Sequence, residues 1–273
     1  MHSDIHQHPT QGHYIELRSL AVGYTHGRSK HAVASGLEAT APPSTLTCII
    51  GRNGRGKSTL LRTLAALQPP LGGQALADGT DISRLAPESM ARTVGIVLTA
   101  RPEATDMTVA ELVQLGRTPY TGFWGRLTTA DRDIAVHAMR SVGIEPLATR
   151  RVCSLSDGEC QKAMIAKTLA QQTPFILLDE PTAFLDFAGK IGLMRLLCQL
   201  AHHEGKTILM TTHDLEMALH TADRLWVMHD EGISEGPPRQ LAASGDIDRY
   251  IDRPDVTLDP RTLSIMLGVK NEE

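Results

Sequence analysis

Residues 51–58 read GRNGRGKS, a glycine-rich stretch that ends in a lysine and a hydroxyl side chain. Gly54 and Gly56 let the backbone curl so that successive N–H groups face one point, where they can hold phosphate oxygens. A helix after the loop would add the positive end of its dipole. Lys57 would then bridge the β- and γ-phosphates of a nucleotide, and Ser58 would ligate Mg²⁺. The spacing G-x-x-x-x-G-K-S predicts a phosphate-binding loop.

Two adjacent acids and a histidine follow later apolar runs and could serve the same chemistry. Asp179 and Glu180 end the run FILLDE, where a buried strand would deliver them to the nucleotide. Asp179 suits the Mg²⁺ shell, and Glu180 suits the base that orients the attacking water. His213 follows the next apolar run, in TTHD, and could contact the γ-phosphate or that water, although a lone histidine is more often structural. Together these residues predict phosphoryl-transfer chemistry.

Residues 153–160 read CSLSDGEC and raise the question of a metal site, because thiols, hydroxyls and carboxylates lie close together. Such groups could bind zinc, but the spacing of Cys153 and Cys160 matches none of the short Cys-x(2–4)-Cys ligand pairs. The histidine-rich residues 1–13 could also capture a metal, but their polar composition equally suits a frayed tail. The cysteines favour a reducing compartment and buried thiols over disulfides: Cys48, Cys153, Cys160 and Cys198.

The phosphate loop must be carried by a strand and a helix, and the sequence supplies both. TLTCII at 45–50 is apolar and β-branched, and LLRTLAALQ at 60–68 has leucines at helical spacing before Pro69 and Pro70 close the helix. Further strands are expected at 14–22, 36–41, 93–98, 175–179, 207–212 and 224–229, with a helix at 192–203. Residues 106–172 look helical throughout, which predicts an inserted helical lobe. The alternation predicts an α/β fold with a mainly parallel sheet and ligands at its carboxyl edge.

Composition excludes several classes of partner. The formal charge of −4, from 27 lysines and arginines against 31 acids, provides no basic field for nucleic acid or an anionic membrane. No apolar run approaches the ~20 residues that span a bilayer, and the first thirty residues contain no apolar signal-peptide core. We therefore expect a cytoplasmic protein that does not bind nucleic acid.

The motifs together resemble those of the ATP-binding-cassette (ABC) ATPases over roughly residues 14–240. In chain order they are GRNGRGKST as Walker A, LSDGE at 155–159 as the signature, ILLDEP as Walker B, AFLD at 183–186 as the D-loop, and TTHD as the switch histidine. The resemblance implies a P-loop NTPase with a RecA-like, mainly parallel sheet, an antiparallel β subdomain and an inserted helical subdomain at about 106–172. Residues 1–13 would then be a flexible tail, and residues 241–273 a short C-terminal extension.

The resemblance also implies where ATP and Mg²⁺ bind. The expected nucleotide contacts are Tyr24, Gly51, Arg52, Asn53, Gly54, Arg55, Gly56, Lys57, Ser58, Thr59, Ser156, Gly158 and Asp186. The expected catalytic residues are Lys57, Glu180 and His213, and the expected Mg²⁺ contacts are Ser58, Asp179 and Thr99. ATP hydrolysis is therefore the activity that the resemblance implies.

In that family two cassettes face each other head to tail, and the signature of one completes the ATP site of the other. Ser156 and the backbone of Gly158 would then meet the γ-phosphate of a nucleotide held by the partner subunit's Lys57. The arrangement implies an isologous, ATP-driven homodimer with two sites. It also makes Cys153 and Cys160 packing thiols rather than zinc ligands.

A few positions depart from the family pattern or allow a second interpretation. Asp157 stands where a glycine is usual and Glu159 where a glutamine is usual, so two extra acids lie near an anionic ligand. We expect Asp157 to point away from the phosphate. Thr99 takes the place of a Mg²⁺-contacting glutamine, and its hydroxyl is a shorter ligand. Tyr24, in AVGY, would be the adenine platform, although an aromatic there could instead cover the core.

The helical lobe and its GR-x-P element at 116–119 resemble ATPase subunits of bacterial importers for iron chelates, haem and cobalamin. Such a subunit would work with a separate membrane permease and, indirectly, an external substrate-binding protein, and would lie at the inner face of the membrane. Residues near Thr99 and Tyr120 would contact the permease. The alternative is a soluble ABC ATPase of iron–sulfur or protein-complex assembly. A P-loop kinase fails to explain LSDGE and TTHD together.

Overall fold

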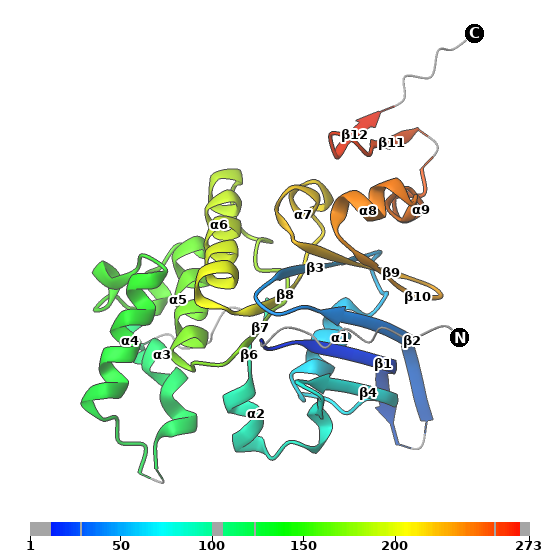
Figure 1. Cartoon of the computed structure of the whole chain (residues 1–273). Helices are drawn as coiled ribbons and strands as arrows, with labels where there is room; N and C mark the ends of the chain where they lie inside the picture. The colour runs from blue at the N-terminus through cyan, green and yellow to red at the C-terminus, as the bar shows by residue number, and fades with distance from the viewer. Residues whose placement is uncertain (1–11, 28, 100–105, 123, 254, 268–273) are drawn as a thin grey trace.

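A computed structural model describes residues 12–267 except 28, 100–105, 123 and 254 (Figure 1). Most of the predicted N-terminal tail, including the histidines at positions 2, 6 and 8, lies outside the described residues. His13, also assigned to that tail, places Nδ1 2.6 Å from Oδ2 of Asp78, and its carbonyl accepts a hydrogen bond from Thr207. Residue 13 is therefore attached to the body of the protein.

The central sheet has six strands in the order β10-β9-β3-β8-β7-β6, all parallel except β10. They are β3 (Leu46–Gly51), β6 (Val94–Val97), β7 (Phe175–Leu178), β8 (Thr207–Thr211), β9 (Arg224–His229) and β10 (Gly232–Gly236). Strands β3, β7 and β8 are buried along their whole length, as parallel strands covered on both faces require. The predicted mainly parallel sheet is confirmed.

A four-stranded antiparallel sheet, β2-β1-β4-β5, packs against the central sheet through helix α1 (Lys57–Leu64). Its strands are β1 (Ile15–His26), β2 (Ser29–Ala41), β4 (Gly72–Ala77) and β5 (Thr80–Asp81). Leu60 and Leu61 share one buried cluster with residues of both sheets, among them Ile15 and Trp226. Strands β1 and β2 extend beyond their predicted ends because they pair as a hairpin as far as His26 and Ser29.

Helices α3 (Val109–Gln114), α4 (Thr129–Ser141) and α5 (Asp157–Ala170) form a lobe at one side of the central sheet (Figure 1). Each begins with a capping box, in which Thr108, Thr128 or Ser156 accepts a backbone N–H and an acid three residues on returns the bond. The lobe shares the larger buried cluster with α6 (Phe187–Glu204) and α7 (Leu215–Thr221). Helix is not continuous over 106–172, because 3₁₀ segments and turns separate the three helices.

The 3₁₀ segment Leu115–Tyr120, which contains the GR-x-P element, ties this lobe together. The guanidinium of Arg117 is nearly inaccessible and donates to Oδ1 of Asp131 at 2.9 Å. The guanidinium groups of Arg92, in α2 (Pro87–Thr93), and of Arg117 lie 5.0 and 4.0 Å from the ring centre of Tyr120. The element that suggested importer ATPases is therefore also a structural joint between the lobe and α2.

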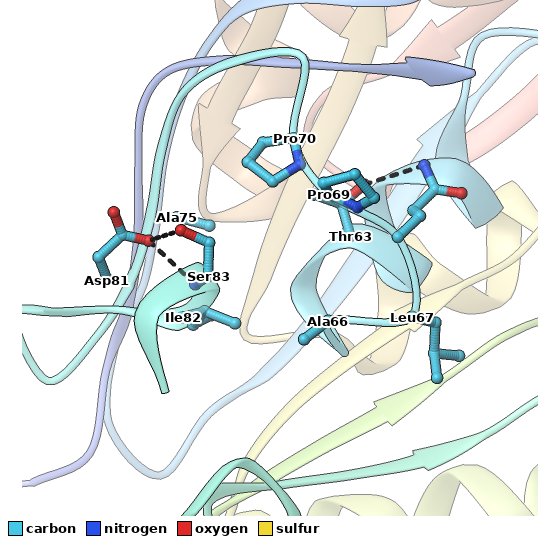
Figure 2. Close-up of a pocket in the computed structure, with 10 residues that line it drawn as sticks. Thr63, Ala66, Leu67, Pro69, Pro70, Ala75, Asp81, Ile82 and Ser83 are labelled. Atoms are coloured by element: carbon cyan, nitrogen blue, oxygen red, sulfur yellow. Dashed lines mark hydrogen bonds between the residues drawn. The ribbon is translucent and has the colours of Figure 1, made fainter. Parts of the chain in front are cut away.

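Helix α1 ends at Leu64, earlier than its predicted end at residue 68. Ala66 adopts a left-handed conformation with φ of 54°, and the N–H of Leu67 bonds back to the carbonyl of Arg62, which closes the helix in a Schellman motif. Pro69 and Pro70 follow this turn rather than ending the helix. Figure 2 shows the turn beside a cavity of about 270 Å³, lined also by Asp81, Ile82 and Ser83.

The C-terminal part of the described chain continues onto the same core. It comprises α8 (Pro238–Ala243), α9 (Asp246–Ile251) and a hairpin of β11 (Val256–Asp259) and β12 (Ser264–Leu267). Leu258 and Leu263, on the hairpin, are buried in the larger cluster. Helix α8 crosses the predicted boundary at residue 240. Among the described helices, none is both long enough and apolar enough to cross a membrane.

Candidate nucleotide site

The phosphate loop leads from β3 into α1, as the sequence predicts. Gly54 and Gly56 have φ values of 81° and 90°, in the left-handed region that glycine adopts without strain. A side chain at Gly56 would also lie 3.0 Å from Val33. Gly56 is the N-cap of α1 and offers no side-chain acceptor, so the first N–H groups of the helix remain available to an anion.

Lys57, the first residue of α1, is nearly buried beneath the loop. Its Nζ donates to the carbonyl of Gly51 at 2.6 Å. Burial lowers the pKa of the Lys57 ammonium, and the nearby carboxylates of Glu180 and Asp179 oppose that shift. The ammonium of Lys57 is therefore held between the carbonyl of Gly51 and the carboxylates of Asp179 and Glu180.

Asp179, directly after β7, joins the loop to the central sheet. Its Oδ1 accepts hydrogen bonds from Oγ of Ser58 and from Oγ1 of Thr211, each at 2.8 Å. Asp179 is 5% exposed, so these hydroxyls offset the burial of its charge. A carboxylate and a hydroxyl are hard oxygen donors, so Ser58 and Asp179 fit the ligand preference of Mg²⁺.

Glu180 and His213 form a second pair on the same edge. Oε1 of Glu180 lies 2.6 Å from Nε2 of His213. The backbone of Glu180 is left-handed, with φ of 48°, and its N–H donates to Oγ1 of Thr211 at 2.9 Å. Both side chains open into a cavity of about 600 Å³, whose other lining residues include Lys190 and Ile265. An acid next to a histidine at an accessible edge could orient and deprotonate a water.

Thr211 is a functional candidate that the sequence reasoning did not single out. Its hydroxyl donates to Asp179 and accepts from Glu180, so one buried group fixes both acids. The available signal was a threonine at the last position of an apolar strand, two residues before His213. A hydroxyl there must find a partner, because a buried polar group without one is costly.

The other predicted nucleotide contacts lie in the loop itself or beside it. The hydroxyl of Tyr24 lies 3.0 Å from Oγ1 of Thr59 in α1, and the ring is 42% exposed, so Tyr24 lies beside the loop rather than in the core. Asn53 is exposed within the loop. The side chains of Arg52 and Arg55 turn towards carboxylates on later segments of the chain.

Thr99 lies beside Asp179 but contacts its backbone. Its hydroxyl donates to the carbonyl of Asp179 at 2.9 Å, not to the carboxylate. Thr99, predicted as a Mg²⁺ contact, is therefore next to Asp179, but its hydroxyl hydrogen is already donated to the main chain. Much of the loop that follows lies outside the described residues.

Ser156 and Gly158 lie at the start of α5, in the helical lobe. Ser156 caps the helix, and its own N–H and hydroxyl donate to Oε2 of Glu159 at 2.8 and 3.0 Å. These bonds lower the pKa of Glu159, with Arg150 adding a smaller effect. A cavity of about 450 Å³ at this point is lined, among the described residues, by the lobe and by the start of α6, not by the phosphate loop. Within one chain, Ser156 and Gly158 therefore line a different cavity from the phosphate loop.

Asp186 and the signature cysteines lie in helices or at their starts, and of these residues only Cys153 departs from its prediction. Asp186 caps α6, its Oδ1 accepting the N–H of Gly189 at 2.8 Å. Cys160 is buried, as expected of a packing thiol, but Cys153 is exposed, so the prediction of burial was wrong there. Cys153 lies in a short 3₁₀ turn before α5, whose apolar contact is made by Val152 instead. Within the described residues, no cluster of histidine, cysteine and acids could hold a metal by such ligands alone.

Comparisons with known proteins agree with this geometry. The family model described as ABC transporter matches residues 34–183. The achromobactin transport ATP-binding protein of Dickeya dadantii (strain 3937) is 38% identical over 229 residues, 83% of each chain. The ferric enterobactin transport ATP-binding protein of Escherichia coli (strain K12) is 38% identical over 226 residues, 82% of this chain and 83% of that protein.

Solved structures give the same fold. A metal-chelate type ABC transporter in an inward-facing conformation aligns with a TM-score of 0.76 at 23% identity, over 94% of this chain and 96% of that chain. A bacterial ABC transporter cassette solved as a dimer aligns with a TM-score of 0.71 at 25% identity, over 82% and 98%. The protein belongs to the ABC transporter family, as an ATP-binding cassette that hydrolyses ATP.

Proposed function

We propose that this cassette powers the uptake of an iron chelate, as the ATP-hydrolysing subunit of an importer. The hydrogen-bonded set of Ser58, Asp179 and Thr211 beside the Glu180–His213 pair is the observation that carries the catalytic part. The relatives named for achromobactin and ferric enterobactin transport support the cargo. Haem and cobalamin, which the sequence resemblance left open, are the other candidate cargoes.

In this proposal the residues divide the work of phosphoryl transfer. Lys57 exchanges its bond to the Gly51 carbonyl for oxygens of the β- and γ-phosphates, which neutralises charge as it develops. Glu180 orients the attacking water and accepts its proton, and His213 holds the carboxylate of Glu180 in place. Ser58 and Asp179 would hold Mg²⁺, which would supply positive charge that offsets the negative charge of the phosphate oxygens.

The active unit in this proposal is an ATP-driven homodimer. Ser156 and the N–H of Gly158 supply donors to a phosphate, yet they line a different cavity from Glu180 and His213. A second copy can bring its own α5 to the first copy's phosphate loop, and two-fold symmetry then makes two equal sites. The related cassette solved as a dimer supports this arrangement. Asp186 would lie at the same interface, because its sequence neighbours Leu185 and Lys190 each line one of the two cavities.

The transport path belongs to other subunits in this proposal. Membrane permease subunits would contact the cassette near Thr99 and Tyr120 and place it peripherally at the cytoplasmic face of the cell membrane. Opening and closing of the dimer would move the permease. An external substrate-binding protein would deliver the chelate to the permease.

A pull-down with the whole chain tests the proposal. Glu180→Gln retains the carboxylate's shape without its basicity, so ATP should lock the complex. Tagged Glu180→Gln protein is purified with ATP from gently solubilised cells, and stoichiometric partners are identified by mass spectrometry. We expect a multi-spanning membrane protein, absent when Lys57→Ala is used instead. Recovery of soluble partners alone would favour the alternative, an ATPase of iron–sulfur or protein-complex assembly.

If a permease is found, the cargo is tested separately. Cells lacking the cassette are given radiolabelled ferric siderophore, haem or cobalamin, and uptake is restored with the parent chain or with Glu180→Gln. We expect only the parent to restore uptake of the iron chelate. Restored uptake of haem or cobalamin without the chelate would reassign the cargo and leave the ATPase intact.

A further inference from the structure

The side chains of the phosphate-loop arginines point to a part of the chain that the ABC motifs do not include. Arg52 donates to Oδ2 of Asp252, at the end of α9, at 2.5 Å. Arg55 pairs with Asp230, in the turn between β9 and β10. These pairs join residues 200 and 175 positions apart in the sequence, so the fold and not the local chain brings them together.

The fold fixes Asp252 rather than leaving it on a loose tail. Asp252 has φ of 45° and ψ of 48° as the C-cap of α9, and its N–H donates to the carbonyl of Asp248 at 2.8 Å. Helix α9 is anchored by Ile247, which is fully buried. The carboxylate therefore faces Arg52 because the end of the helix directs it there.

The charges around this point balance. A cavity of about 270 Å³ lies between the loop and α9, and its charged lining residues are Arg52, Arg55, Arg249, Asp230, Glu231 and Asp252, with His229 beside them. Arg249 pairs with Glu231 at 2.7 Å, so each guanidinium has a carboxylate partner. Burial is the main cause of a lowered pKa for His229, which favours its neutral form. Loss of one carboxylate would therefore leave one uncompensated positive charge beside the phosphate loop.

Arg52 also belongs to the loop itself. Its carbonyl lies 3.4 Å from Nζ of Lys57, and its neighbour Gly51 accepts from the same ammonium. A guanidinium is a strong partner for phosphate oxygens, and a triphosphate carries several negative charges. Asp252 and a bound triphosphate would therefore attract the same side chain.

We propose that Asp252 is a positioning residue that holds Arg52 and competes with the nucleotide phosphates for it, which weakens ATP binding. This inference rests on the proposed function. The C-terminal segment is thereby part of the nucleotide site, and it reaches the catalytic edge as well, because Ile265 of β12 lines the cavity of Glu180 and His213. The ion pair between Arg52 and Asp252 thus links ATP binding to the C-terminal segment.

The test compares ATP affinity in whole-chain variants by calorimetry at low ionic strength. Asp252→Asn removes the charge, and asparagine accepts the left-handed backbone of residue 252, so the fold is retained. We expect the Kd for ATP to fall about threefold to fivefold, in line with a half-exposed ion pair, while kcat changes less than about twofold. Glu145→Gln is the matched control, since it also removes a carboxylate from an exposed ion pair with an arginine, Arg140. That pair lies in the helical lobe, and its residues are far from the phosphate loop in the sequence.

A double variant identifies the route of the effect. In an Arg52→Ala background, Asp252→Asn should no longer change the Kd for ATP, because the competing side chain is gone. An unchanged Kd in Asp252→Asn alone, an equal change in Glu145→Gln, or a change that persists without Arg52 would each overturn the inference. Failure of the proposed function is distinguishable, because it would appear in the pull-down and uptake experiments while the parent chain still bound ATP.

Discussion

The N-termini of α1 and α5 are both expected to face phosphate, yet they are built differently. Helix α1 begins at Gly56 with no side-chain cap, beneath a curled loop, and strand ends place Asp179 and Glu180 beside it. Helix α5 begins with the box of Ser156 and Glu159, so one of its first N–H groups already has a partner. An open terminus surrounded by acids and hydroxyls can bind a triphosphate and cleave its terminal phosphoanhydride bond, whereas a capped, exposed one can only add donors. In the proposed dimer, the second terminus therefore adds its donors to the nucleotide site of the other chain.

The largest effect should come from the open terminus. Lys57→Ala removes the ammonium that donates to the carbonyl of Gly51 and should weaken ATP binding at least about a hundredfold, since a charged phosphate contact is lost. Titration calorimetry measures the change. Lys206→Ala is the matched control, because Lys206 is also a lysine whose pKa burial lowers, but it donates to the carbonyl of Thr173. If both variants bound ATP equally well, Lys57 at the N-terminus of α1 would not be a phosphate contact.

The support beneath the two acids should come next. Thr211→Val keeps the shape of a fully buried side chain but leaves the N–H of Glu180 without its acceptor and Asp179 with one donor fewer. We expect kcat to fall about tenfold and the free energy of unfolding to fall by about 1–3 kcal/mol. Thr47→Val is the control, because the hydroxyl of Thr47 is also buried but finds no partner among the described residues. Equal losses in both variants, by ATPase assay and denaturant titration, would make Thr211 a packing residue only.

The capped terminus should separate stability from function. Ser156→Ala and Thr128→Ala each remove a capping hydroxyl from a helix of the lobe, so each should lower the free energy of unfolding by about 1 kcal/mol. Only Ser156→Ala should also reduce ATP hydrolysis, while ATP binding by the monomer stays unchanged. Steady-state ATPase rates and calorimetry on both variants give the contrast. Equal ATPase rates would reduce Ser156 to a cap.

The smallest effect concerns the acid in that cap. Glu159→Gln retains an acceptor for the N–H and hydroxyl of Ser156 but removes a negative charge from the end of α5 that would approach phosphate. We expect ATP-driven association to strengthen about twofold to threefold, with the thermal midpoint nearly unchanged. Analytical ultracentrifugation in ATP measures it, in a Glu180→Gln background. Weaker association would mean that the carboxylate itself contributes a contact.

The N-terminus of α1 and its phosphate loop could be predicted from the sequence, because the residue patterns that specify them are local. Glycine spacing specified the loop around Gly54 and Gly56, and apolar runs located β7 and β8 to within a residue or so. The end of α1 was placed too late, because the left-handed residue that closes the helix is Ala66 and not the glycine that usually marks such a position. The roles of Thr211 and Asp252 were missed because each depends on contacts between distant segments, which no local pattern contains.

The central claim is that one chain holds the open terminus and another must supply the capped one. Its most direct test is the molar mass of Glu180→Gln protein by size exclusion with light scattering, with and without ATP and Mg²⁺. We predict 29.6 kDa without ATP, twice that mass with it, and a return towards the single-chain mass when Ser156→Ala is added. A single-chain mass at saturating ATP, with ATP binding confirmed in the same sample, would contradict the claim.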